Sequence, residues 1–242
     1  MGNFKRAFDN IPPVTKNLIL INVVIWLVMM VAGRRADSTI LDFGGLHYFE
    51  ASDFNVLQIF TYMFMHSTGN FAHILFNMFT LFMFGILLER TLGAKRFLFY
   101  YISCGIGAAL VQEAVWAMTW EGIFAKMMHV DSFTFQQILA HSSPEQISGA
   151  LNSFVTIGAS GAIFGVLLAF GMLFPNLPTY IMFIPVPIKA KWMVIGYGVL
   201  ELLIGMSEAN DGVAHFAHLG GMLFGFFIIL YWKKKNVIHG GY

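Results

Sequence analysis

Two side chains in separate apolar stretches have the chemistry of a hydrolytic nucleophile and its base. Ser160 lies near the start of the stretch at 154–174, and His218 lies near the start of the stretch at 213–232. A serine hydroxyl is a weak nucleophile that needs an adjacent base, and at a helix start it lies beside backbone N–H groups that favour an oxyanion. Both stretches are expected to run in the same direction, so a rise of about 1.5 Å per residue puts the two residues at similar depth. We therefore predict that the hydroxyl and the imidazole meet.

Each of these residues also has a simpler interpretation. Ser160 could be a small residue that lets two helices approach, and His218 could hydrogen-bond a backbone carbonyl. His215, one turn before His218, is an alternative base. We favour His218 as the base because His215 is expected to lie closer to the aqueous surface and further from the glycines described next.

Glycines accompany both residues at helical spacing. Gly161 and Gly165 are four residues apart in the first stretch, and Gly221 and Gly225 share the face of His218 in the second. Small residues at this spacing let membrane helices pack backbone to backbone. The pattern predicts that the two helices lie in close contact.

A histidine and an asparagine lie in another apolar stretch, at 71–88. His73 and Asn77 are four residues apart and therefore share one face of a helix. Taken alone, this pair is typical of hydrogen bonds that join helices within a membrane bundle.

The composition indicates a membrane protein. Of 242 residues, 57% are hydrophobic and 11% are charged, whereas soluble domains average about 25% charged residues. The net charge of +1 gives no basic surface for nucleic acid, and a single cysteine excludes an internal disulfide and a multi-thiolate zinc site. Six apolar stretches can be read as membrane helices: 17–32, 71–88, 97–112, 154–174, 192–206 and 213–232.

The distribution of lysine and arginine predicts the orientation. Eleven of the fourteen lie in segments on one side of the expected membrane, which marks that side as cytoplasmic. An even number of spans then puts both termini in the cytoplasm, as an N-terminal segment (1–16) and a C-terminal tail (233–242) around a membrane domain (17–232). A cleaved signal peptide at 1–33 is the alternative, but it would leave an odd number of spans.

Two long connections are expected outside, at about 34–70 and 113–153. The first is aromatic enough to form a short amphipathic segment at the membrane surface. The second has two apolar runs around Pro144, which predict two short helices. Prolines between 175 and 187 are expected to interrupt the chain on the inner side.

The residues above resemble, in order and spacing, the signature of the rhomboid intramembrane serine proteases. The matching motifs are His73-Ile-Leu-Phe-Asn77, Gly158-Ala-Ser160-Gly161, Ala217-His218-Leu-Gly-Gly221 with Gly225, and the positions Gly85, Glu89, Arg90, Leu92 and Gly93. The resemblance covers residues 17 to 232. It implies an all-α, six-helix bundle with a water-filled cavity that opens to the outside.

The resemblance also assigns roles. It implies that Ser160 is the nucleophile and His218 its general base and acid. His73 and Asn77 would stabilise the oxyanion together with the Ser160 amide, and Phe164 would pack on the histidine ring, where the family often has tyrosine. We expect no Asp or Glu beside His218, and therefore a catalytic dyad.

Some positions depart from the family pattern. Leu57 and Gln58 stand where many members have Trp-Arg in the first outer loop, and His66 lies near a further family histidine without matching its spacing. Glu201 is the one acid within an apolar stretch. We expect it to make a hydrogen bond inside the bundle and to take no part in catalysis.

The sequence therefore predicts a multi-pass membrane endopeptidase, expected in a bacterial inner membrane, that cleaves transmembrane segments of other proteins through an acyl-enzyme. Lipid and transmembrane substrates are the expected partners, and no metal or other cofactor is required. Three alternatives remain: an inactive rhomboid-like protein that binds membrane helices, a metal or haem protein using His73, His215 and His218, and a transporter. The last two lack an HExxH helix and a sequence repeat, respectively.

Overall fold

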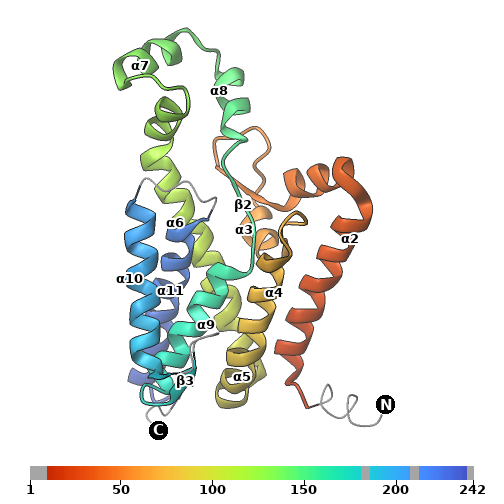
Figure 1. Cartoon of the computed structure of the whole chain (residues 1–242), viewed down its shortest axis with the longest axis vertical. Coiled ribbons are helices and arrows are strands. Elements are labelled where there is room, and N and C mark those ends of the chain that lie inside the picture. Colours follow the sequence, from red (N-terminus) through yellow and green to blue (C-terminus); the bar gives the residue numbers. More distant parts are fainter. Residues whose placement is uncertain (1–9, 181–185, 208–212, 239–242) are drawn as a thin grey trace.

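The computed structural model describes residues 10–180, 186–207 and 213–238, with the side chains of 33–38 left out. Lys5, Arg6, Pro185, Glu208 and Asp211, which contribute to the charge and proline patterns, lie outside the described residues. Within them the fold is an upright bundle of helices with a smaller helical layer at one end (Figure 1).

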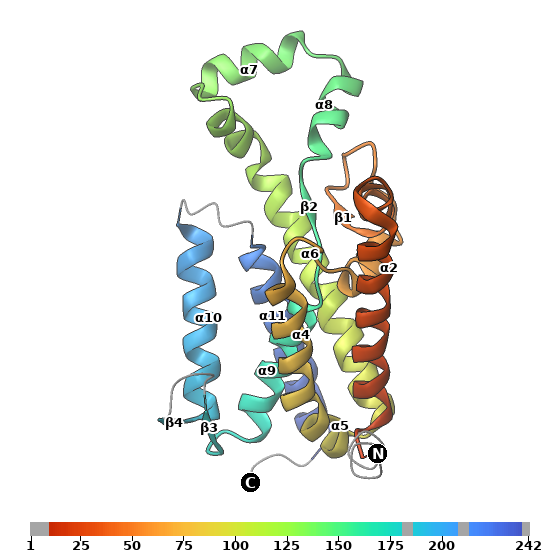
Figure 2. The ribbon, with the colours of Figure 1, turned by 45° about the vertical axis from the view of Figure 1, so that its right-hand side comes forward.

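The bundle is built from seven α-helices and one π-helical turn among the described residues. In chain order they are α2 (Pro13–Gly44), α4 (Phe71–Thr80), the π-helical η2 (Leu81–Gly85), α5 (Ile86–Leu92), α6 (Ala94–Met127), α9 (Ser160–Leu173), α10 (Ala190–Met206) and α11 (His215–Lys234). Helices α6, α9 and α11 pack against one another at the centre, while α2 and α10 lie on opposite flanks (Figure 2).

Four segments of the described residues are long and apolar enough to cross a membrane: Pro13–Ala32, Phe71–Leu92, Ala94–Met127 and His215–Lys234. The protein is therefore an all-α integral membrane protein. Helix α9 has 14 residues and α10 has 17, which is short of the roughly 20 residues that a membrane core requires. Their assignment as the remaining two of six spans stays a prediction.

Two helices extend well past the apolar stretches that predicted them. The stretch at 17–32 belongs to a helix that continues to Gly44, and the stretch at 97–112 belongs to one that continues to Met127. The first parts of both expected outer loops are thus helical. Hydropathy marks where lipid is the solvent, whereas a helix ends where capping residues stop it.

The rest of the 113–153 connection forms the predicted pair of short helices. Helix α7 (Ser132–His141) is capped by Asp131, whose carboxylate accepts the Thr134 N–H at 2.8 Å, and this bond lowers the pKa of Asp131. Helix α8 (Pro144–Leu151) is capped by Ser143, which forms a capping box with Gln146. Both lie beyond the end of the bundle (Figure 1).

The connections at 34–70 and 113–153 are joined to each other. Strand β1 (Leu46–His47) pairs antiparallel with β2 (Val155–Thr156), with Leu46 opposite Thr156. The amphipathic segment expected in 34–70 contains helix α3 (Gln58–Thr61) and a 3₁₀ turn, η1 (Tyr62–Phe64). All three residues of η1 are buried, so this segment supports this end of the bundle from within.

Gln58, at one of the two positions that depart from the family pattern, joins several segments at this end of the bundle. Its side-chain amide donates to the carbonyls of Asp42 at 2.9 Å and Asp53 at 2.8 Å, and its carbonyl oxygen accepts the His47 N–H at 3.2 Å. Leu57 beside it is 59% exposed. The buried glutamine thus joins the end of α2, the β1 strand and the following turn through its side chain.

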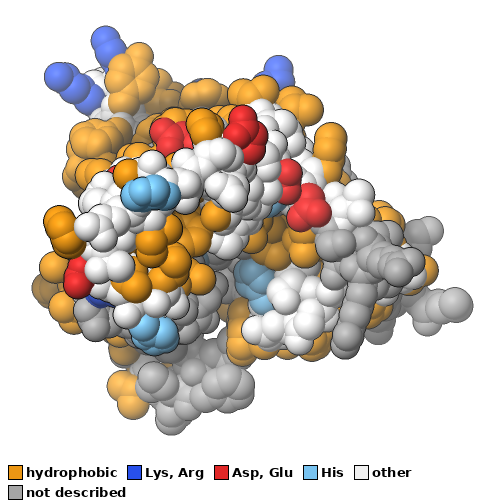
Figure 3. All heavy atoms as spheres, turned by 90° about the horizontal axis from the view of Figure 1, so that it is seen from above, with side chains coloured by type: hydrophobic (Ala, Val, Ile, Leu, Met, Phe, Trp, Pro, Cys, Tyr) orange, Lys and Arg blue, Asp and Glu red, His pale blue; other side chains and the backbone are white. Residues whose placement is uncertain are grey.

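The opposite end of the bundle holds the start of α2 and the end of α11 (Figures 1 and 2). The hairpin of β3 (Pro178–Tyr180) and β4 (Pro187–Lys189) lies at this end too, where prolines were expected to break the chain. The basic residues at 95–96, 189–191 and 233–235 belong to elements at this end. The other end carries acidic and histidine side chains on its face (Figure 3).

Candidate active site

Helix α9 begins at Ser160 because the two residues before it turn the chain into the bundle. Gly158 has a φ of 127°, a conformation that only glycine adopts readily, and its N–H donates to the Tyr62 carbonyl at 3.0 Å. A side chain at Gly158 would lie 2.8 Å from Nε2 of His73. Ser160 is therefore the first residue of α9, where backbone N–H groups have no acceptor within the helix.

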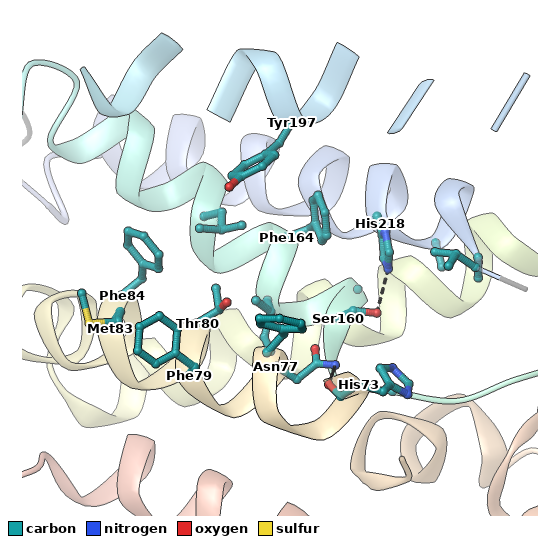
Figure 4. Close-up of a pocket in the computed structure, with 18 of the residues that line it drawn as sticks. His73, Asn77, Phe79, Thr80, Met83, Phe84, Ser160, Phe164, Tyr197 and His218 are labelled. Atoms are coloured by element: carbon teal, nitrogen blue, oxygen red, sulfur yellow. Dashed lines mark hydrogen bonds between the residues drawn. The ribbon is translucent and has the colours of Figure 1, made fainter. Parts of the chain in front are cut away.

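The structure brings Ser160 and His218 together. The two side chains are joined by a hydrogen bond of 2.7 Å between Ser160 Oγ and His218 Nε2, drawn as the dashed line in Figure 4. His218 is in the first turn of α11 and is 7% exposed. The imidazole stacks on the ring of Phe164, with centroids 4.3 Å apart and planes 6° apart. These contacts fix the ring in one orientation.

Glycines let α9 and α11 approach closely enough for Ser160 to reach His218. Not all of them do so by direct packing of the two helices, as was expected. A β-carbon on Gly221 would overlap the Gly161 carbonyl oxygen, so α9 and α11 touch backbone to backbone there. Gly225 instead makes room for the Tyr100 hydroxyl of α6, which donates to the Gly165 carbonyl at 2.7 Å. Gly225 thus packs α11 against α6, and only indirectly against α9.

His73 and Asn77 of α4 line the same cavity as the serine and histidine. The Asn77 amide donates one N–H to the His73 carbonyl at 2.8 Å, which leaves its second N–H for another acceptor. The ring of His66 lies beside that of His73, with centroids 5.0 Å apart. In Figure 4, His73, Asn77 and Ser160 come from facing helices toward one point.

Glu201 corrects the expectation that no acid lies near His218. Its Oε2 atom is 2.8 Å from Nδ1 of His218 and 2.7 Å from Nδ1 of His215. The carboxylate reaches them because α10 and α11 are neighbouring helices and Glu201 lies near the end of α10. The sequence contains one signal for such a contact: Glu201 is the one acid within an apolar stretch. A buried acid in a membrane requires a partner.

The side chains of Glu201, His215 and His218 are also of types that can bind a metal ion. Their facing oxygen and nitrogen atoms are already joined by hydrogen bonds of 2.7 and 2.8 Å. These hydrogen bonds are sufficient to account for the spacing of the atoms.

The cavity around Ser160 has a volume of about 1460 Å³. It extends from Ser160 along α4 and η2 on one side and α10 on the other, past Phe79, Met83 and Tyr197 (Figure 4). Its lining is mostly apolar away from the polar groups at Ser160. A chain with apolar side chains and one polar carbonyl would match such a lining.

The fold and site define an all-α membrane protein with a serine and a histidine hydrogen-bonded to each other in a large, mostly apolar cavity. The family model for the Rhomboid domain matches residues 53–235. The chain therefore belongs to the rhomboid family.

Several known proteins are similar to this chain. Rhomboid protease AarA of Providencia stuartii is 27% identical over 223 residues, which cover 87% of this chain and 69% of that protein. RHOMBOID-like protein 5 of Arabidopsis thaliana is 29% identical over 160 residues, covering 66% of this chain and 39% of the relative. Rhomboid protein 1, mitochondrial, of Saccharomyces cerevisiae is 29% identical over 159 residues, covering 66% of this chain and 37% of the yeast protein.

Proposed function

We propose that this protein is an intramembrane serine endopeptidase that cleaves transmembrane segments of other membrane proteins. The observation that carries the proposal is the hydrogen bond of 2.7 Å between Ser160 and His218 at the polar end of a largely apolar cavity. Family membership and the similarity to a protein named as a rhomboid protease support it.

In the proposed reaction, Ser160 Oγ attacks the carbonyl carbon of the scissile peptide bond and its proton passes to His218 Nε2. The C–N bond then breaks, and the leaving amine takes that proton from His218, which gives an acyl-enzyme. Water deprotonated by His218 attacks the ester, and the returning proton restores the serine hydroxyl. The carboxyl product leaves.

The negative charge of each tetrahedral intermediate requires nearby donors. The Ser160 N–H, the His73 ring and the Asn77 side-chain amide are the proposed donors, since all three border the space in front of Ser160 Oγ. Preorganised donors of this kind are typically worth about 10²–10³ in rate each.

The substrate must expose a peptide carbonyl before it can react. A transmembrane helix satisfies its backbone groups internally, so the segment must unwind locally on entering the cavity. Substrates are expected to have small or helix-breaking residues near the cleaved bond.

Purified protein in detergent or liposomes tests the proposal. It is incubated with a reporter transmembrane substrate and, separately, with a fluorescent fluorophosphonate that labels activated serines. Wild type is expected to cut and to be labelled. Ser160→Ala and His218→Ala are expected to lose cutting by roughly 10³-fold or more, and EDTA is expected to have no effect.

Cutting that survives Ser160→Ala, or that EDTA abolishes, would remove the serine assignment. Wild-type protein that binds the substrate helix and neither cuts it nor reacts with fluorophosphonate would indicate the inactive, helix-binding alternative.

We further propose that both termini lie in the cytoplasm and that α7 and α8 lie on the outer side of a bacterial inner membrane. The basic residues at the end of the bundle opposite α7 support this orientation. Cys104 is buried, so a Cys104→Ala background with single cysteines tests it. A membrane-impermeant maleimide should label His141→Cys in intact cells and Lys234→Cys only after lysis; the reverse pattern would invert the topology.

A further inference from the structure

One carboxylate oxygen of α10 contacts two imidazoles of α11. Glu201 Oε2 lies 2.7 Å from His215 Nδ1 and 2.8 Å from His218 Nδ1. The Glu201 side chain is 12% exposed, so water has little access to compete for these bonds.

These contacts determine which nitrogen of His218 carries the proton. An ionised carboxylate only accepts hydrogen bonds, so the Nδ1 atom facing it must be the one that donates. The lone pair of a neutral His218 is then on Nε2, which is the atom facing Ser160 Oγ at 2.7 Å. This is the tautomer that a general base needs.

The carboxylate is itself held in place. Its second contact, with His215, prevents rotation that would break the bond to His218, and the stacked Phe164 ring limits His218 to the same plane. Among the described residues, the groups that face the His218 ring are Ser160 and Phe164 of α9, Glu201 of α10 and His215 of its own helix, with His73 of α4 across the cavity.

Proton transfer from Ser160 makes His218 cationic. A cation inside a membrane protein is costly unless an opposite charge lies beside it, and Glu201 is placed to supply that charge. The carboxylate therefore favours both the reactive tautomer before proton transfer and the imidazolium after it, as the acid of a serine protease triad does.

We propose that Glu201 is a positioning residue that converts the serine–histidine pair into a serine–histidine–glutamate triad. His215 acts as the second donor that fixes the carboxylate. The inference rests on the proposed function, because it concerns how His218 is prepared for the same reaction.

The experiment compares Glu201→Gln, Glu201→Asp and wild type in the cleavage assay with EDTA present. An amide can donate to Nδ1 and stabilise the wrong tautomer, so Glu201→Gln should lower kcat by roughly 10²-fold or more and change KM little. Fluorophosphonate labelling of Ser160 should slow in parallel. Glu201→Asp keeps the charge and should recover part of the loss.

Glu113→Gln is the matched control. Glu113 is a second buried glutamate in a membrane-spanning helix, and it accepts a single backbone hydrogen bond, from Phe49 at 3.0 Å. The kcat of the Glu113→Gln variant should stay at the wild-type value. If Glu201 only held α10 against α11, Glu201→Gln would lower thermal stability while kcat per folded molecule stayed unchanged, and this would overturn the inference.

A double mutant and a spectroscopic measurement add readouts that a purely structural role would not move. In a His218→Ala background, Glu201→Gln should lower the residual rate no further, because residues that act as a unit are not additive. Histidine-labelled wild type should show a downfield Nδ1–H proton resonance that His218→Ala removes. Its absence would overturn the inference even if no Glu201 variant folds.

The outcomes also separate this inference from the proposed function. If wild type cuts, Ser160→Ala does not, and Glu201→Gln keeps the wild-type kcat, the inference fails alone. If wild type neither cuts nor is labelled, the proposed function fails first. Loss of wild-type cutting in EDTA would overturn both.

Discussion

The α-carbon of Gly221 on α11 lies against the backbone of Gly161 on α9, so closely that a methyl group there would lie 2.7 Å from the Gly161 carbonyl carbon. Gly161 follows Ser160 directly, and Gly221 is one turn after His218. The contact between the two glycines thus sets the distance between the two helices at the depth of the candidate active site.

Gly221→Ala should therefore disrupt both packing and chemistry. The methyl group meets backbone, which cannot rotate away, so α11 must shift from α9. We expect a loss of about 1–3 kcal/mol in unfolding free energy, as for other overpacked cores. We also expect kcat to fall by roughly 10²-fold or more, because small misplacements of catalytic groups are costly. Thermal unfolding and the cleavage assay measure the two effects.

Gly196→Ala is the control for this substitution. Gly196 is in α10, and an added β-carbon there meets no atom within 4 Å. Alanine is also the better helix former, so stability and kcat should be at or above wild type. Equal behaviour of the two variants would mean that the helix contact at Gly221 does not set the site.

The Phe164 ring holds His218 by stacking, and its removal should affect turnover more than binding. Aromatic stacking contributes roughly 0.5–1.5 kcal/mol, so Phe164→Leu should lower kcat by about 2–13-fold if that free energy orients the imidazole in the transition state. Phe164→Tyr keeps the ring and should stay close to wild type. A larger loss for tyrosine than for leucine would show that ring stacking is not what Phe164 provides.

His73 and Asn77 should act in the transition state. Each of His73→Ala and Asn77→Ala removes one proposed oxyanion donor and should lower kcat by about 10²–10³-fold with little change in KM. His141→Ala, on exposed α7, is the control and should match wild type. A rise in KM with kcat unchanged would instead place the two residues in ground-state substrate binding.

Sequence periodicity was enough to anticipate the meeting of Ser160 and His218. Both are in the first turn of helices that start at the same end of the bundle, and helical rise makes depth readable from residue number. The close approach of α9 and α11 at Gly161 and Gly221 could be predicted for the same reason. These inferences need only local geometry and a direction for each helix.

The contact of Glu201 with His218 could not be predicted from the sequence, because it depends on the rotation and tilt of α10 relative to α11.

The ends of the helices could not be predicted for a different reason. Polar residues such as Gln112 and Glu113 of α6 are buried within the structure, so the helix continues where hydropathy alone suggests an end. Tertiary contacts decide both features, and a single sequence does not carry them.

Glu89 provides a test of stability that is separate from catalysis. Its side chain, 3% exposed, caps the start of α2: its two oxygens accept the Val14 N–H at 2.9 Å and the Thr15 N–H at 2.7 Å. The Thr15 hydroxyl donates to it as well, at 2.8 Å. A carboxylate at a helix N-terminus is stabilised by the unpaired N–H groups there.

Glu89→Gln keeps the shape but replaces one accepting oxygen with a donor that faces another donor. The variant should lose about 1–3 kcal/mol of unfolding free energy, whereas kcat per folded molecule should not change, because α5 lies at the end of the bundle away from α7 and α8 (Figure 1). Glu121→Gln is the matched control, since Glu121 is exposed and its bond to Gln136 is open to water. Chemical denaturation in detergent ranks the two variants. Equal stability would show that the buried cap is dispensable, and a fall in kcat at unchanged stability would show that the start of α2 is coupled to the cavity.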